Sequence, residues 1–240
     1  ARNPWEPPGR VDGKSGTFAP GEHLRDALRL IVPAACPSST SPVRSSRTWR
    51  SMPSPENRKT GFRAKGRAPF DINGARAAPG KLTQVELQVA RLPTGMWMTL
   101  PVGVLHGVTD GPVIWISAAI HGDELNGVPI IRHVLDRINP KELTGTVLAV
   151  PAVNVFGLVQ ESRYLPDRRD LNRCFPGSKR GSSASQLAHL FMEQIVTRCE
   201  LGLDLHTGSG GRTNLPQVRC DLEQEETLRL AKVFGAPELL

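Results

Sequence analysis

The segment Val113-Ile-Trp-Ile-Ser-Ala-Ala-Ile-His-Gly-Asp-Glu124 carries the clearest structural signal in the chain. Its first eight residues form an almost continuous apolar run, which is typical of a strand buried on both faces of a sheet. The Gly111-Pro112 pair before the run indicates a turn, and His121 stands just past the end of the run. We therefore expect a buried strand that delivers His121 at its carboxyl end.

The remainder of the folded part alternates between extended and helical patterns. Leu82 to Val89 and Met96 to Leu105 predict an antiparallel lead-in of two strands. The pattern then predicts further elements in this order: a helix on Val128, Ile131, Leu135 and Ile138, ended by Asn139-Pro140; a strand at Gly145–Val150; a long loop at Asn154–Arg173; a helix at Ser185–Cys199; a strand at Leu201–Leu205; and a helix around Leu228, Ala231 and Phe234. This alternation predicts an α/β fold with a mixed, mainly parallel sheet and helices on both faces.

His121, Glu124 and His206 have the residue types and spacing of a catalytic zinc site. Such a site takes three protein ligands and leaves a fourth position for water. His121 and Glu124 are three residues apart, and His206 follows the predicted strand at Leu201–Leu205. Ligands of open α/β sheets bind outside the carboxyl ends of the strands, where both histidines fall. Glu124 could instead favour the start of the next helix through the helix dipole, but we predict one Zn²⁺ per domain on these three side chains.

Three ordered segments resemble the succinylglutamate desuccinylase/aspartoacylase family, which is related to the zinc carboxypeptidases. They are Ser117–Gly127 with His121-Gly-Asp-Glu124, Ser162–Arg173 with Asp170-Leu-Asn-Arg173, and Leu203–Gly208 with Asp204-Leu-His206. The resemblance covers about Ala68 to Leu240. It implies a carboxypeptidase-like fold and a zinc-dependent hydrolase that removes an acyl group from an amino-acid-like substrate.

The resemblance also implies roles for residues around the metal. Arg163 would stabilise the oxyanion of the reaction. The segment between it and Asp170 looks slightly longer than in the aspartoacylases, so Arg168 or Arg169 could substitute. Asn172 and Arg173 would bind a substrate carboxylate, which the planar guanidinium matches with two hydrogen bonds.

Two aspartates are candidates for orienting the histidine ligands. By resemblance, Asp170 would accept a hydrogen bond from the far nitrogen of one histidine, which fixes its tautomer. Asp204 lies two residues before His206, so along a strand both point to the same face. We predict that Asp204 orients the second histidine; for either aspartate, a plain helix cap or a position in a surface loop is the alternative.

The general base of the family is a glutamate well downstream of the third ligand. The acidic candidates after His206 are Glu223, Glu225, Glu226 and Glu238, and they fit a solvated helix start or the last residues of the chain. We assign none of them as the base and expect it beyond Leu240. The zinc hydrolase domain, 69–240, is therefore expected to be C-terminally incomplete and feebly active alone.

Residues 1–68 differ in composition from the rest. They hold 13 Lys and Arg against 5 Asp and Glu, whereas the other 172 residues hold 17 against 18. This Pro/Ser/Arg-rich tail is expected to be disordered or extraneous. Because the domain with the motifs is almost neutral, we expect no nucleic-acid partner, although a binder acting through the tail would show steep salt dependence.

The remaining partner and compartment predictions follow from what the sequence contains. No apolar run has the length of a membrane span, so no membrane partner is expected. The four cysteines form no Cys-x-x-Cys pair, which disfavours a thiolate zinc site and favours the cytoplasm. The expected partner is a small molecule with a carboxylate. A zinc carboxypeptidase and an inactive metal-binding relative remain alternatives to the deacylase.

Overall fold

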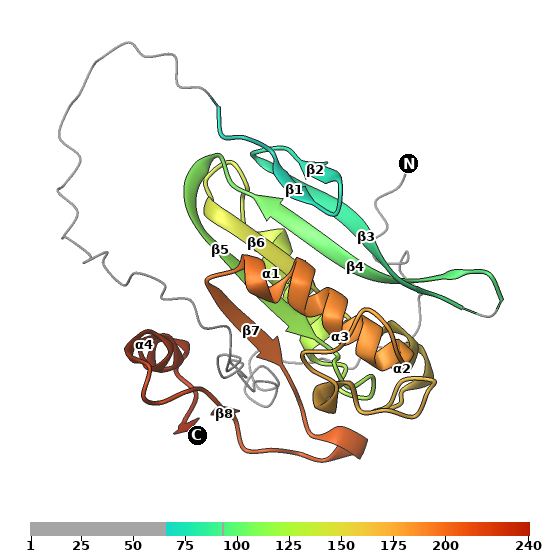
Figure 1. The fold of residues 1–240 in the computed structure, drawn as a ribbon. Helices are drawn as coiled ribbons and strands as arrows, with labels where there is room; N and C mark the ends of the chain where they lie inside the picture. The colour runs from blue at the N-terminus through green and yellow to red at the C-terminus, as the bar shows by residue number, and fades with distance from the viewer. Residues whose placement is uncertain (1–65, 93) are drawn as a thin grey trace, which may run out of the picture.

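A computed structural model describes residues 66–92 and 94–240, and its centre is a five-stranded mixed sheet (Figure 1). The strands lie in the order β3-β4-β6-β5-β7. Their bounds are β3 Lys81–Arg91, β4 Trp97–His106, β5 Thr109–Ala118, β6 Thr144–Val150 and β7 Leu201–Leu205. The predicted basic tail, 1–68, lies almost wholly outside the described residues.

The sheet is less parallel than the sequence suggested. β5 runs parallel to β6 on one side and to β7 on the other. The β3–β4 hairpin is antiparallel, and β4 also pairs antiparallel with β6. The predicted lead-in therefore supplies two of the five strands of the sheet. "Mainly parallel" is wrong because two of the four pairings are antiparallel.

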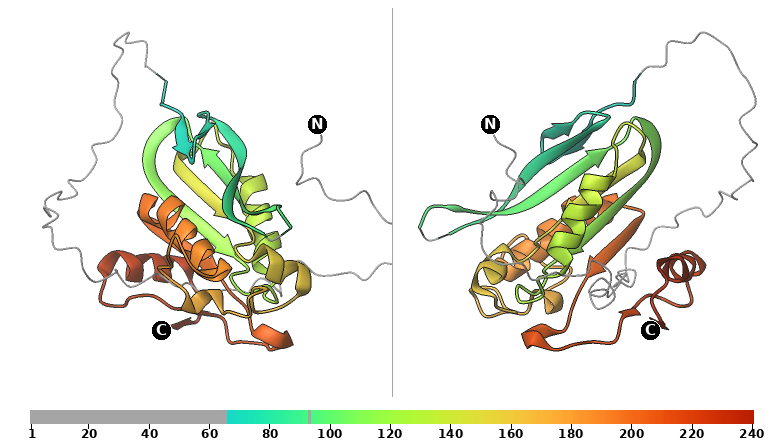
Figure 2. Two further views of the ribbon diagram at one scale, coloured as in Figure 1. Left: turned by 45° about the vertical axis from the view of Figure 1, so that its right-hand side comes forward. Right: turned by 180° about the vertical axis from the view of Figure 1, so that it is seen from behind.

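Helices cover both faces of the sheet. Their bounds are α1 Gly127–Arg137, α2 Val155–Gln160, α3 Ser183–Gln194 and α4 Glu225–Phe234, with 3₁₀ turns at Leu171–Arg173, Val196–Arg198 and Ser209–Gly211. Successive residues of β5 point to opposite faces. Trp115 packs in the cluster that contains Phe191 of α3, and Ile116 packs in the one that contains Ile131 of α1. Figure 1 shows α3 in front of the sheet, and the rear view of Figure 2 shows α1 in front of it.

Two smaller units flank the sheet. A β1–β2 hairpin, Phe70–Ile72 and Ala75–Ala77, precedes it and packs into the α3-side cluster. After β7, the strands β8 Gln217–Val218 and β9 Glu238–Leu239 pair in parallel. Val218 of β8 and Ala231 of α4 form the centre of a small apolar cluster separate from the two clusters of the main sheet. None of the helices in the described part is long and apolar enough to cross a membrane.

Three local predictions were wrong. Gly111-Pro112 lies inside β5 at a register shift between Thr109 and Val113, and an irregular stretch tolerates a proline that cannot donate a ladder hydrogen bond. The long loop contains α2, which begins because the Asn154 side chain accepts from Gly157 N. The helix expected to reach Cys199 ends at Gln194, and a separate 3₁₀ turn follows it.

Candidate metal centre

The predicted metal ligands lie at the carboxyl ends of the adjacent parallel strands β5 and β7 (Figure 1). After β5 the chain turns sharply at Ala119, which has a positive φ of 50°. His121 follows within the turn, and His206 is the first residue after β7. The turn rests on α2, because a Cβ on Gly122 would collide with the backbone of Gly157. Only glycine allows so close an approach.

Three buried side chains converge in this region. His121, Glu124 and His206 each offer one ligand atom, and these atoms lie within 4.8 Å of one another. Glu124 bridges the histidines: its Oε1 is 2.7 Å from His121 Nδ1 and its Oε2 is 2.9 Å from His206 Nδ1. Glu124 precedes α1, whose first turn holds no acidic residue, so its carboxylate serves the histidines rather than the helix.

Each histidine is held from behind by a different carboxylate. His121 Nε2 donates to Asp170 Oδ1 at 3.1 Å, and His206 Nε2 donates to Asp204 Oδ2 at 2.7 Å. A metal-binding imidazole usually donates its other N–H to such a partner, which fixes the tautomer and turns the free lone pair toward the metal. The two predicted orienting aspartates therefore lie where that role requires, and both Nδ1 atoms face Glu124.

The charges of the cluster are strongly coupled. Burial alone would raise the pKa of Glu124, but hydrogen bonds from His121, His206 and Thr207 N outweigh it and lower the pKa to about 2. Burial would lower the pKa of His206, but the Asp204 and Glu124 carboxylates raise it to about 9. In the metal-free protein a proton on His206 thus compensates the buried acidic groups. Two imidazoles and a carboxylate form a donor set that fits zinc.

Arg163 lies beside the ligands. Its guanidinium donates to Asp170 Oδ2 through Nε at 3.2 Å and Nη2 at 2.9 Å. Its Nη1 is 3.7 Å from Glu124 Oε1 and 3.4 Å from His121 Nδ1. Arg168 and Arg169, the alternatives for its role, are exposed farther along the same loop. The arginine charge and its hydrogen bonds, together with the nearby His121, outweigh burial and lower the pKa of Asp170.

The predicted carboxylate binders lie on the 3₁₀ turn Leu171–Arg173. Asp170 caps this turn by accepting from Asn172 N at 2.9 Å. The side chain of Arg173 is exposed, and its Nη1 donates to the Asn172 carbonyl. The structure therefore ties the turn to the metal ligands through Asp170, and it leaves the Arg173 guanidinium facing solvent. The acidic residues considered as a base are all exposed, in or near α4 or in β9: Glu223, Glu225, Glu226 and Glu238.

Several polar residues that support the site were not predicted from the sequence. Asp123 Oδ2 accepts from Ser209 Oγ and Gly210 N, so it binds the segment after His206 to the metal-binding turn. Ser117 Oγ donates to Asp204 Oδ1. Asn154, fully buried, caps α2 beneath the turn. A serine inside the apolar run of β5 was the one visible signal, because an apolar strand rarely buries a hydroxyl without a partner.

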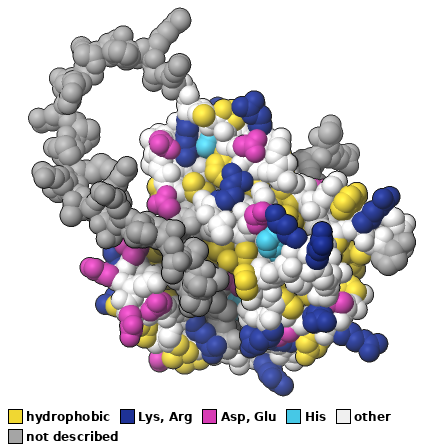
Figure 3. Space-filling view, viewed as in Figure 1, with side chains coloured by type: hydrophobic (Ala, Val, Ile, Leu, Met, Phe, Trp, Pro, Cys, Tyr) yellow, Lys and Arg dark blue, Asp and Glu magenta, His cyan; other side chains and the backbone are white. Residues whose placement is uncertain are grey.

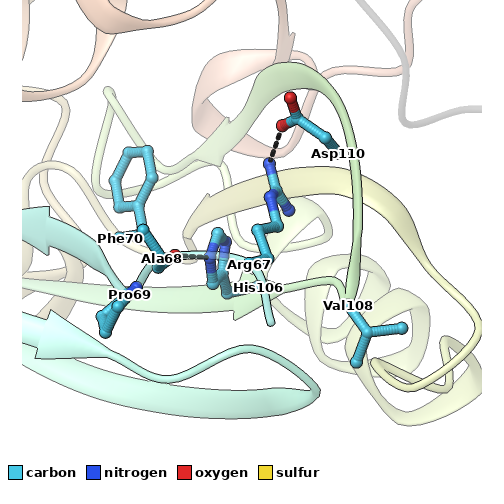
Figure 4. A pocket seen from close by; sticks show the side chains of 7 residues that line it. All are labelled: Arg67, Ala68, Pro69, Phe70, His106, Val108 and Asp110. Carbon is cyan, nitrogen blue, oxygen red and sulfur yellow. Dashed lines mark hydrogen bonds and ion pairs between the residues drawn. The ribbon is translucent and has the colours of Figure 1, made fainter. Parts of the chain in front are cut away.

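A separate cavity of about 520 Å³, lined by the residues labelled in Figure 4, lies at the opposite end of the sheet, where the end of β4 pairs with the start of β6. Its lining includes Arg67, Phe70, His106 and Asp110. His106 Nε2 donates to the Ala68 carbonyl, and its Nδ1 contacts Thr146 Oγ1 at 2.8 Å. Burial lowers the pKa of His106. Both nitrogens of this histidine are thus used to attach the segment before β1 to β4 and β6.

The loops around the metal centre are basic. Residues 161–182 hold six Lys and Arg against three Asp and Glu. Figure 3 shows Lys and Arg side chains gathered at the lower right of the face, whereas acidic side chains lie at the lower left, where Figure 1 has α4. A local excess of positive charge attracts anionic ligands.

The family assignment follows from a comparison with known sequences. Residues 110–240 match the succinylglutamate desuccinylase/aspartoacylase catalytic domain. The chain belongs to this family. The matched region contains both histidines, Glu124, Arg163 and the Asp170–Arg173 segment.

The chain is similar to one characterised enzyme in sequence and to several solved structures in fold. An N-alpha-acetyl-L-2,4-diaminobutyric acid deacetylase of Halomonas elongata is 35% identical over 136 residues, which cover 53% of this chain and 39% of that protein. A succinylglutamate desuccinylase/aspartoacylase structure from Rhodobacter sphaeroides has a TM-score of 0.60 and 27% identity over 73% of this chain and 55% of that one. An aspartoacylase family structure from Mesorhizobium loti has a TM-score of 0.61 and 26% identity over 72% and 56%. The chain thus spans about half the length of these solved family members.

Proposed function

We propose that this chain carries the active site of a zinc-dependent deacylase, which hydrolyses the amide bond of an N-acyl amino acid or a similar small carboxylate. The observation that carries the proposal is the ligand cluster. His121 and His206 turn their Nδ1 atoms toward Glu124, and separate carboxylates hold their Nε2 atoms. The 35% identical deacetylase of Halomonas elongata supports the reaction class.

The residues of the chain have distinct tasks in this proposal. A zinc ion held by His121, Glu124 and His206 would lower the pKa of a water and polarise the substrate carbonyl. Glu124 remains ionised because its pKa is lowered to about 2. Asp170 and Asp204 fix the two imidazoles. Their task is to keep both Nδ1 lone pairs directed at the same point.

Two arginines would act on the substrate. Asp170 holds Arg163 next to Glu124, where its N–H groups can donate to the oxygen that becomes negative in the transition state. Arg173 carries an exposed guanidinium on the turn that Asp170 caps, and it would bind the substrate carboxylate through both of its terminal nitrogens. The excess of basic residues in 161–182 favours the approach of such an anion.

Metal analysis and substrate assays test the proposal together. The purified protein should bind one zinc per chain, and His121→Ala and His206→Ala should each lose it. A panel of N-acyl amino acids, including N-acetylated diamino acids, should be hydrolysed in preference to peptides with a free C-terminus. Stoichiometric zinc in both variants would reject the ligand assignment.

The same assays separate the alternatives. Preferred cleavage of a C-terminal residue from peptides would identify a zinc carboxypeptidase. Zinc binding without turnover of either class, when the protein is assayed at its full natural length, would identify an inactive metal-binding relative. For the compartment we propose the cytoplasm, which the free thiols of Cys174, Cys199 and Cys220 support.

A further inference from the structure

Ser117 is a fully buried hydroxyl near the carboxyl end of the apolar strand β5. It lies on β5 between Ile116 and Ala118, and its register partner on β7 is Asp204. A buried hydroxyl without a hydrogen bond is costly, so its partner indicates what the residue does. Ser117 Oγ donates to Asp204 Oδ1 at 2.6 Å.

This hydrogen bond determines how Asp204 can interact with the third ligand. Asp204 Oδ1 accepts from Ser117, and Asp204 Oδ2 accepts from His206 Nε2 at 2.7 Å. With one oxygen held by the strand beside it, the carboxylate cannot rotate freely about its χ2 bond. It therefore presents its second oxygen in the plane that keeps the proton on Nε2 and the lone pair on Nδ1.

The two orienting carboxylates are supported differently. Asp170 accepts from the Arg163 guanidinium and from Asn172 N as well as from His121. Asp204 is buried, and the hydrogen bonds given to its carboxylate within the described part of the chain come from Ser117 and His206. Ser117 therefore supplies alone the support that two residues, Arg163 and Asn172, share on the His121 side.

We propose that Ser117 is a positioning residue for the metal centre, acting through Asp204 on the orientation and tautomer of His206. The chain of contacts runs from the β5 strand to Asp204 on β7, then to His206, and ends at Glu124. This role rests on the proposed zinc site. It predicts an effect on zinc affinity and on the His206 ring, which can be measured without any substrate.

The experiment compares zinc affinity, by competition with a chromophoric chelator, among variants that differ in one hydroxyl. Removing a side chain that hydrogen-bonds to a metal ligand typically lowers the metal affinity about 10–100-fold. Because Ser117 acts through Asp204, we expect Ser117→Ala to weaken zinc binding about tenfold, near the lower limit. Ser117→Thr keeps the donor and should restore most of the affinity. Ser117→Cys keeps the volume with a weak donor and should resemble Ser117→Ala.

A matched control removes another buried hydroxyl from the same sheet. Thr146 on β6 contacts the buried His106 at the opposite end, so Thr146→Val loses the same kind of hydrogen bond away from the metal ligands. Its zinc affinity should equal that of the wild type. ¹⁵N-resolved NMR of the histidine rings gives a second readout: the His206 Nε2–H signal should be protected in the wild type and exchange faster in Ser117→Ala.

The outcomes separate this role from the proposed function. Equal zinc affinity and an equal His206 signal in wild type and Ser117→Ala would overturn the role of Ser117 alone. Failure of the wild type to bind zinc would remove the metal assignment and this role with it. If Ser117→Ala does not fold, Ser117→Cys decides, with circular dichroism confirming that the compared proteins are folded.

Discussion

Glu124 connects the two candidate histidine ligands through one buried carboxylate. Each of its oxygens faces one Nδ1, and Oε2 also accepts from Thr207 N at 2.9 Å. A carboxylate with several donors remains ionised even when it is buried. At the level of residues, the site is thus a network of buried charged groups, in which Glu124, Asp170 and Asp204 each accept at least one hydrogen bond.

The two arginines near the site should respond differently to substitution. In protein that turns over substrate, Arg173→Lys should weaken the reaction of carboxylate substrates about tenfold more than that of their esters or amides, because lysine keeps the charge and loses the planar fork. Arg163→Ala should lower kcat and kcat/KM by similar factors, as expected for an interaction made in the transition state. Steady-state kinetics on paired acid and ester substrates provide the measurement.

A matched control for these variants is Arg180→Lys. This arginine is exposed in the same basic loop and is not assigned to the site. It should alter the kinetics by less than about twofold, since exposed charges contribute little. Equal effects of Arg173→Lys on charged and neutral substrates would contradict the assigned division between the arginines.

At the level of elements, the adjacent carboxyl ends of β5 and β7 bring distant motifs together. The sequence predicted both strands, because a buried parallel strand has a strong apolar pattern. It also singled out both histidines and the two aspartates that contact them, because their motifs stand at the ends of these strands or in the loop between them, and their roles as metal ligands and orienting groups stay predictions. It missed α2, since six residues are too short to show helical periodicity. It also missed Ser117, whose partner on β7 depends on a register that no local pattern reveals.

The contact between the metal-binding turn and α2 yields a prediction about Gly122. A Cβ there would collide with the Gly157 backbone, which cannot move away as a flexible side chain could. Gly122→Ala should therefore destabilise the protein by about 1–3 kcal/mol or more and weaken zinc binding. Gly66→Ala is the matched control, because nothing lies within 4 Å of its added Cβ. Chemical denaturation and zinc titration of both variants provide the test, and an unaltered Gly122→Ala protein would show that the turn does not rest on α2.

At the level of the whole molecule, both faces of the sheet help to fix the end of the sheet where the candidate metal ligands lie. The cluster on the α3 side and the cluster on the α1 side each take alternate residues of β5, so the strand that precedes His121 is fixed from both sides. Strands placed so rigidly suit a metal site, whose ligands must hold their geometry. The basic loops at that edge add a long-range attraction for anions.

The coupled charges of the metal centre predict how the stability of the whole protein depends on pH. In chelator-treated protein, the lowered pKa of Glu124 contributes stability that is present above about pH 4.5 and lost as the pH falls toward 2. The raised pKa of His206 contributes stability that is present below about pH 6.5 and lost as the pH rises through 9. The Tm without metal should therefore be highest between these limits.

Zinc should reverse the loss at alkaline pH. Zinc competes with the proton on His206, so its affinity rises with pH, and ligand binding to the native state raises the Tm. The increase in Tm on adding zinc should thus be larger at pH 8 than at pH 6. Thermal unfolding followed by circular dichroism from pH 4 to 9, with chelator or with excess zinc, measures the dependence of the Tm on pH in both states.

The control variant is His206→Gln, whose side chain cannot be protonated, so its Tm should not fall at alkaline pH. A chelator-treated wild type whose Tm stays constant from pH 6.5 to 9 would contradict the raised pKa and the compensation of the buried carboxylates by the His206 proton.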